Sequence, residues 1–329
     1  MNPKIKTSIR YSIFLGIGIV LMWWAYKDVD FDAMGKSLSQ AHWFWIVIAL
    51  VLNYSATAYR GFRWNTLLQP LGYKVGKWTA VHSVAFGYLM NDLIPRSGEV
   101  ARCTLLNRAE KVPMDKLIGT VILERIVDVI MLATILMLTL ILHQDALFSL
   151  FSHVDAGKGK ILIILAVVGI VGLIAFFLVL KKLRHIAFVD RVAVFFIGIG
   201  SGIKSILKLK QKGQFILWTL GIWVTWLVMT QCMMYALEET KMLTPVDSLF
   251  LMAAASLGML VPTQGGLGAY HFMTMLAFVA LGFANADDPQ RSDIGLTFAA
   301  ISWGGKTILE LVMGAVGFFA VTAFKMKKE

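Results

Sequence analysis

The sequence has few of the residues on which disulfide-bonded, metal-binding and common catalytic proteins depend. It holds two cysteines in 329 residues, Cys103 and Cys232, far apart and each within or beside an apolar run. This excludes a disulfide framework and a cysteine-based zinc motif. The six histidines show no metal-ligand spacing, and H-E-x-x-H, G-x-S-x-G and P-loop motifs are missing. We therefore expect a protein without a metal, a cofactor or a recognisable catalytic motif.

Charge is also scarce. Charged residues make up 16% of the chain and hydrophobic residues 58%, with a mean hydropathy of +0.72, whereas a soluble domain has about 25% charged residues. Because the polar stretches are too short to bury a core of their own, we predict a single polytopic membrane domain over 1–329. The net charge of +11 does not indicate a nucleic acid partner, since lysine and arginine lie in short loops between apolar runs, as membrane proteins place them.

Several apolar runs approach the ~20 residues that a helix needs to cross ~30 Å of hydrocarbon. They cover approximately 9–26, 43–59, 117–142, 161–180, 214–237 and 293–323. The sequence thus predicts an all-α membrane protein with about six full spans. A further segment near 186–208 is amphipathic at helical spacing and basic at its end, which predicts a helix along the cytoplasmic surface.

Loop charges predict the orientation. Placing the basic loops inside puts both termini in the cytoplasm. The membrane that we expect for this chain is a bacterial cytoplasmic (inner) membrane. The first apolar run could be a signal peptide, but it lacks an A-x-A-like cleavage site and ends in Trp23, Trp24 and Tyr26. We interpret it as an uncleaved first span with an interfacial aromatic belt.

Two other hydrophobic regions, 78–110 and 245–283, are interrupted by polar or glycine-rich breaks. The loop charges require each region to leave the membrane on the side where it entered, which predicts two re-entrant helical hairpins. For the second region, two complete short spans satisfy the same requirement. Both breaks contain P-x-x-G, at 95–98 and 262–265, and they enter from opposite sides. This is the pattern of an inverted repeat whose broken helices form a substrate site near the midplane.

Charged residues at membrane depth are costly, about 2.5–3.5 kcal/mol each on insertion scales, and therefore indicate function. Those in this chain are Arg96, Glu99, Arg102, Glu124, Arg125, Asp128, Lys306 and Glu310. Arg96 and Arg102 flank a helix N-terminus at Gly98, an arrangement suited to phosphate. The alternative is structural: Glu124 and Asp128 would neutralise these two arginines and anchor the first hairpin.

Four motifs resemble the lysylphosphatidylglycerol synthase transmembrane (flippase-like) family, which includes the membrane domain of the multiple peptide resistance factor. They are R-G-F-R-W at 60–64, N-D-L-I-P-R-S-G-E-V-A-R at 91–102, E-R-I-V-D at 124–128 and P-T-Q-G-G-L-G-A at 262–269. The resemblance implies two oppositely oriented re-entrant hairpins and movement of lipids between leaflets. In the resistance factor a soluble domain makes the aminoacylated lipid. This chain ends soon after its last span without such a domain, so the resemblance does not imply lysyl transfer.

The predicted substrate site joins the membrane-depth charges to the motif residues. It consists of Asn91, Arg96, Glu99 and Arg102 at the first break, Glu124, Arg125 and Asp128 on the next span, Arg63, Pro262, Gly265, Gly266, Lys306 and Glu310. For Arg63 and its neighbour Arg60 the alternative is an ordinary anchor on the cytoplasmic side.

We expect a lipid flippase or transporter, not an enzyme, that moves a phosphate-bearing phospholipid, aminoacylated lipid or isoprenoid lipid between leaflets. One alternative is a membrane-embedded transferase or hydrolase for a lipid-linked substrate, with Glu124 and Asp128 as acid and base. Another is a non-catalytic partner subunit of a lipid-modifying enzyme. The expected partners are a membrane lipid with an anionic head group and either further copies of the chain or a separate lipid-modifying enzyme.

Overall fold

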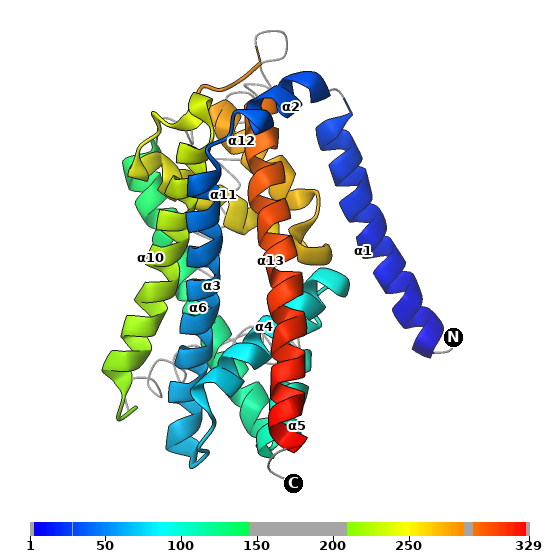
Figure 1. Cartoon of the computed structure of the whole chain (residues 1–329), viewed down its shortest axis with the longest axis vertical. Coiled ribbons are helices and arrows are strands. Elements are labelled where there is room, and N and C mark those ends of the chain that lie inside the picture. The colour runs from blue at the N-terminus through cyan, green and yellow to red at the C-terminus, as the bar shows by residue number, and fades with distance from the viewer. Residues whose placement is uncertain (1–2, 28, 145–208, 286–291, 327–329) are drawn as a thin grey trace, which may run out of the picture.

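The computed structural model describes residues 3–27, 29–144, 209–285 and 292–326, and all regular elements in this part are helical (Figure 1). The α-helices are α1 (Pro3–Tyr26), α2 (Phe31–Ser39), α3 (Trp43–Leu68), α4 (Lys77–Leu93), α5 (Gly98–Glu110), α6 (Met114–Leu142), α10 (Lys212–Ala236), α11 (Pro245–Leu260), α12 (Ala269–Ala280) and α13 (Asp293–Met326). Short 3-10 turns are η1 (Gln69–Leu71), η2 (Glu238–Thr240) and η3 (Gln264–Gly266). The predicted all-α class is confirmed.

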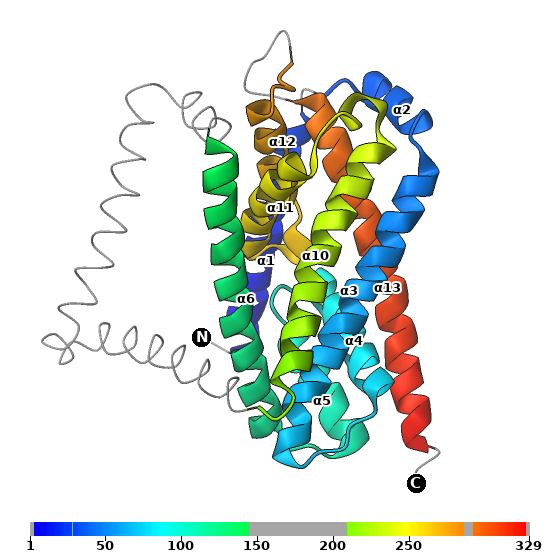
Figure 2. The same cartoon turned by 90° about the vertical axis from the view of Figure 1, so that its left-hand side faces the viewer.

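Long helices form the frame of the molecule. Helices α6, α10 and α13 are each long and apolar enough to cross a bilayer, and α2 with α3, bent by 86°, would make a fourth span. Figure 2 shows α3, α6, α10 and α13 running lengthwise through the molecule. Helices occupy the predicted apolar runs within the described residues. The predicted span 161–180 and the predicted amphipathic helix near 186–208 lie outside those residues.

Each interrupted region is a pair of shorter helices joined at a break. Helices α4 and α5 are joined through 94–97, and α11 and α12 through 261–268. The first pair lies in the lower half of the molecule and the second in the upper half, with the breaks facing each other at mid-height (Figure 1). Arg96 Nη2 donates a hydrogen bond to the Leu260 carbonyl at 3.1 Å, which ties the two breaks together.

Local sequence explains where these helices begin. Pro245 is the first residue of α11, where the hydroxyl of Thr244 and the carboxylate of Asp247 form a reciprocal capping box. The start of α5 is capped across its own hairpin, because Asn91 Oδ1 accepts from Gly98 N at 2.7 Å. A Cβ on Gly98 would lie 2.1 Å from the Gly87 carbonyl oxygen, so only glycine permits α4 and α5 to approach this closely.

Two apolar cores hold the helix pairs in place. Trp64, Leu106 and Leu117 pack α5 between α3 and α6, while Phe250 and Phe278 belong to a second core that joins α11 and α12 to α3, α10 and α13. Outward faces of the long helices carry further large apolar side chains. They include Ile122 and Ile141 on α6, Leu217 on α10, and Ile308 and Phe319 on α13, all well exposed. Such continuous apolar exposure suits contact with lipid hydrocarbon.

Candidate functional site

Three helices bring five charged side chains together in the lower half of the molecule. Arg60 and Arg63 come from α3, Arg102 from α5, and Glu124 and Asp128 from α6. We refer to these five residues as the α3–α5–α6 cluster. Arg63 is completely buried, and Glu124 is 1% exposed. Because isolated buried charges are strongly unfavourable, the cluster must be held by pairing within itself.

The pairing is dense. Arg63 Nη1 donates to Asp128 Oδ1 at 2.8 Å, and its Nε lies 3.5 Å from Glu124 Oε1. Arg102 Nη2 donates to Glu124 Oε2 at 2.5 Å. Arg60 Nη1 is 3.6 Å from Asp128 Oδ2. Within the cluster, Arg63 and Arg102 share Glu124, and Arg63 and Arg60 share Asp128. The one-turn spacing of the two carboxylates on α6 allows this sharing.

Aromatic rings cover the guanidinium groups of this cluster. The Arg60 guanidinium lies 5.0 Å from the Trp226 ring centroid and 5.9 Å from that of Tyr88. The Arg102 guanidinium lies 4.6 Å from the centroid of Trp64. Cation–π contacts of this kind stabilise a positive charge after water has been removed.

The cluster opens to its surroundings at one edge. Arg125 on α6 lies 3.3 Å from Glu99 on α5 and 3.9 Å from Asp128. Its side chain is 46% exposed and that of Glu99 is 31% exposed. The five residues of the cluster comprise three arginines and two carboxylates, and the rim adds one residue of each sign, so the site as a whole has one excess positive charge behind its accessible edge. That is the electrostatic condition for binding an anionic group.

A second charge cluster joins α4 to α13 near the breaks. Lys306 Nζ donates to Glu310 Oε2 at 2.9 Å, and Asp92 of α4 interacts electrostatically with both residues. With both carboxylates ionised, neither Asp92 oxygen has a hydrogen-bond donor within the described part of the chain, although both oxygens are buried. We call these three residues the α4–α13 cluster; its two carboxylates face a single ammonium group.

The glycine-rich break of the second pair contacts the α4–α13 cluster. Gly265 and Gly266 have φ values of +54° and +84°, which favour glycine. A Cβ on Gly265 would lie 2.3 Å from Asp92 Oδ1, so the missing side chain makes room for that carboxylate. Trp303 Nε1 holds the loop by donating to the Gly265 carbonyl at 2.8 Å.

The structure separates the predicted site residues into these regions. The α3–α5–α6 cluster contains Arg63, Arg102, Glu124 and Asp128, with Glu99 and Arg125 at its rim. The α4–α13 cluster contains Lys306 and Glu310, beside Gly265. Asn91 caps α5, and Pro262 and Gly266 belong to the second break. The sequence interpretation favoured a phosphate-binding role for Arg96, and its structural alternative paired Arg96 with Glu124 and Asp128. In the structure Arg96 is exposed and donates instead to Leu260, because the left-handed turn at Arg96 (φ +58°) lies at the tip of the hairpin.

Sequence reasoning did not include Arg60 or Asp92 in the site. Arg60 was interpreted with Arg63 as a cytoplasmic anchor, yet the two are 7% and 0% exposed. Their three-residue spacing on one helix, which places them on one face, was the available signal. Asp92 precedes the proline of the first break by three residues, and only the packing of α4 against α13 gives it charged partners.

Comparison with known proteins gives a family match and similar membrane proteins. Residues 11–287 match the family described as the lysylphosphatidylglycerol synthase TM region. A UPF0104 membrane protein of Pyrococcus horikoshii is 27% identical over 132 residues, and one of Methanocaldococcus jannaschii is 24% identical over 128 residues. Each match covers 38% of this chain and 38% of the relative, so the aligned part spans well under half of either protein. No solved structure matches the chain.

Proposed function

This chain belongs to the lysylphosphatidylglycerol synthase transmembrane family of membrane proteins, and on that basis we propose that it is a lipid flippase. In this proposal it moves a lipid with a phosphate-bearing head group between the leaflets of the cytoplasmic membrane, without changing the lipid chemically. The head group passes the α3–α5–α6 cluster and its rim, while the hydrocarbon tail remains in the bilayer.

The lengths of the broken helices support two re-entrant hairpins. Helices α4, α5, α11 and α12 have 17, 13, 16 and 12 residues. At ~1.5 Å per residue, none of them covers the ~30 Å of a hydrocarbon core. Each pair turns back at mid-height, one in the lower half and the other in the upper half (Figure 1). We propose that they are the inverted pair of a transporter fold, with the substrate path between their breaks.

Loop charges support an orientation with the lower half toward the cytoplasm. Lys74 lies between α3 and α4, and Lys111 and Lys116 follow α5, at the same end of the molecule as the end of α13 (Figure 1). By the positive-inside rule this end is cytoplasmic. The C-terminus is then cytoplasmic, and the rim of the α3–α5–α6 cluster faces the cytoplasmic half of the bilayer.

The observation that carries the proposal is a buried cluster with one more arginine than carboxylates, beside a half-exposed arginine, Arg125, at its edge. A salt-bridge network that served only to join helices would balance its charges, since an uncompensated buried charge is costly. Here Arg125 stands at the accessible edge and can exchange Glu99 for a phosphate, which accepts two hydrogen bonds from one guanidinium.

The same contacts argue against an enzyme that uses Glu124 and Asp128 as acid and base. Each carboxylate is held by at least two arginines, and Glu124 is buried, so neither is placed to exchange a proton with a substrate. We therefore propose transport rather than group transfer.

The test is a flipping assay in proteoliposomes. The purified full chain is reconstituted with a trace of fluorescent phosphatidylglycerol, and a membrane-impermeant quencher measures how fast the inner-leaflet probe becomes accessible. We expect faster exchange than in protein-free vesicles. We expect about tenfold slower exchange with Arg125→Gln, since a charge-assisted hydrogen bond to phosphate is lost. Arg108→Gln, an exposed arginine on α5, is the matched control and should behave as wild type.

Other outcomes would overturn the proposal. Exchange equal to that of protein-free vesicles would exclude flipping of this lipid by the chain alone, and recovery on adding a lipid-modifying enzyme would favour a partner subunit. A change in the mass of the recovered lipid would favour a transferase or hydrolase. Equal loss in the Arg125 and Arg108 variants would remove the specific role of the rim.

A further inference from the structure

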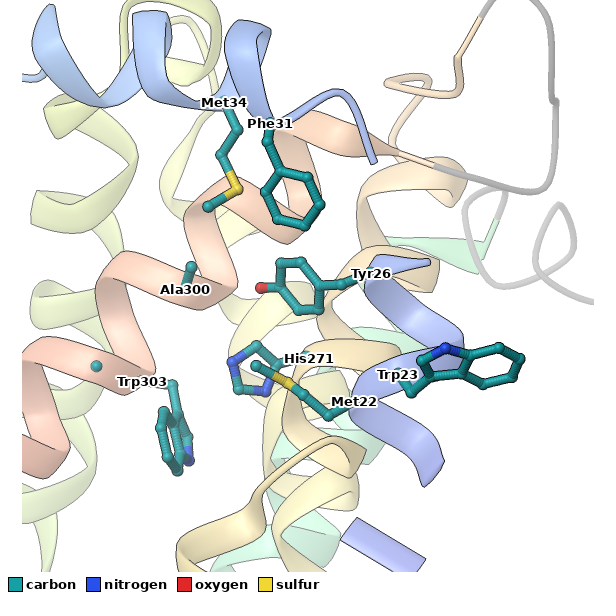
Figure 3. Close-up of a pocket in the computed structure, with 9 residues that line it drawn as sticks. Met22, Trp23, Tyr26, Phe31, Met34, His271, Ala300 and Trp303 are labelled. Carbon is teal, nitrogen blue, oxygen red and sulfur yellow. The ribbon is translucent and has the colours of Figure 1, made fainter. Parts of the chain in front are cut away.

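An apolar cavity of about 450 Å³ lies in the upper half of the molecule, away from the α3–α5–α6 cluster. Its walls come from the end of α1, the start of α2, α12 and α13, with Met22, Tyr26, Met34 and Ala300 among the lining residues (Figure 3). The volume falls within the range of small-molecule sites. Methionine side chains adapt to flexible apolar ligands, and two of them line this cavity.

The position of the cavity indicates what can fill it. Tyr26 is the last residue of α1 and Phe31 the first of α2, so the cavity lies where helices end and not at mid-height. Trp23 and Trp24, both exposed, lie at the same level, as expected for an interfacial aromatic belt. Below this level Figure 1 shows α1 diverging from α13 toward its N-terminus. A molecule in the cavity would therefore have one end at the membrane interface and the rest directed into hydrocarbon.

One polar side chain in the wall has no partner. His271 on α12 is completely buried, and neither ring nitrogen has a hydrogen-bond partner among the described residues. Aromatic rings surround it, with centroids 5.7 Å away for Tyr26 and 5.2 Å away for Trp303. Figure 3 shows the imidazole between these two side chains, facing the cavity. A buried polar group without a partner is unfavourable, which points to a ligand that completes its hydrogen bonding.

From these observations we propose that the cavity binds one acyl chain of a glycerophospholipid, with its ester carbonyl accepting a hydrogen bond from His271. The chemistry fits at both ends: hydrocarbon fills the apolar walls, and the ester carbonyl oxygen at the top of the chain accepts from the N–H of the unpartnered His271 imidazole. Trp303 lines the cavity and also donates to Gly265 in the second break, so it connects the chain-binding cavity to the α4–α13 cluster. This proposal rests on the proposed function for the identification of a lipid substrate, and it adds where the tail is held.

The probe is phosphatidylglycerol with a photoreactive diazirine on one chain, in an ester-linked and an ether-linked form. The purified full chain in detergent is irradiated with sub-saturating probe, and labelled peptides are identified by mass spectrometry. We expect the ester probe to label peptides that carry Met22, Met34 or Ala300. The ether probe, which lacks the carbonyl, should label them about fivefold less, as expected for one lost hydrogen bond.

Variants separate the acyl chain from the hydrogen bond. Ala300→Trp fills the cavity and should abolish this labelling, while Ala320→Trp, at a partly exposed alanine of α13 that does not line the cavity, should leave it unchanged. His271→Phe keeps the ring volume and should reduce ester labelling to the ether level, so the two probes become equal. If the labelling lost by removing both the carbonyl and the imidazole is no greater than that lost by removing either one, the two groups interact directly.

Labelling spread over the outward faces of α6 and α13 and insensitive to Ala300→Trp would overturn the chain-binding site. An ester preference that persists in His271→Phe would overturn the assigned hydrogen bond. Exchange in proteoliposomes is measured on the same variants, so the two proposals fail separately. Flipping without cavity labelling removes only the chain-binding site, and cavity labelling without flipping removes only the transport function.

Discussion

Replacing Arg63 with methionine removes the guanidinium that Glu124 and Asp128 share, while keeping an unbranched apolar side chain of similar length. Arg63 is completely buried, and its loss leaves Glu124 with Arg102 alone and Asp128 without its 2.8 Å hydrogen bond. Breaking a buried ion pair by removing one partner costs about 3–5 kcal/mol, since the remaining charge stays desolvated. At about 2 °C of melting temperature per kcal/mol for a large domain, we expect a decrease of about 6–10 °C.

The chain contains a convenient reporter for this measurement. Cys103 and Cys232 are both buried free thiols, so a fluorogenic thiol-reactive dye reports unfolding in detergent on heating. Arg63→Lys keeps the charge but loses the planar guanidinium, and we expect an intermediate melting temperature. Arg108→Met, at an exposed position, should melt within about 1 °C of wild type. If Arg63→Met melts as Arg108→Met does, the α3–α5–α6 cluster does not hold these helices together and our reasoning on its pairing is wrong.

Two further predictions concern the breaks. Gly98→Ala should lower the melting temperature, since the new Cβ would meet a backbone carbonyl of α4 at 2.1 Å and overpacking costs about 1–3 kcal/mol. Gly119→Ala is the control, because Gly119 has open space around it, and it should not lower the melting temperature. Equal melting temperatures for the two variants would refute the close approach of α4 and α5. Asp92→Asn should raise the melting temperature by removing repulsion from Glu310, yet slow lipid exchange if the α4–α13 cluster lies on the substrate path. A lower melting temperature for this variant would show that the Asp92 charge is compensated.

Local pattern in the sequence predicted most of the helices and both breaks. Apolar runs correspond to α1, α3, α6, α10 and α13, and proline with glycine marked the end of α4 and of α11. A helix in a membrane depends on backbone hydrogen bonds within its own segment and on the transfer of that segment's side chains from water to hydrocarbon. The residues of one short segment are therefore enough to predict it. The charged residues were also recognisable, because ionisable side chains in apolar segments are conspicuous.

Partner choice among those charges could not be predicted in the same way. Glu99 and Arg102, three residues apart on α5, could have paired with each other, but Glu99 contacts Arg125 and Arg102 contacts Glu124. Arg60 resembled a loop anchor until the packing of α3 against α10 buried it beside Trp226. Such pairings depend on how helices distant in the chain rotate and cross, which single-segment patterns do not specify.

By itself the sequence determined that this is an all-helical membrane protein with two broken helical regions and costly internal charges. Only the tertiary structure decided that the charges divide into two clusters, that Asp92 fits beside Gly265, and that His271 lies unpartnered in the wall of an apolar cavity. The physical reason is that the signals for an apolar span and for a helix end are contained in residues close together in the sequence. Charge pairing and cavities arise from contacts between segments far apart in the chain, such as those of Asp92 and Lys306 or of Tyr26 and Leu296.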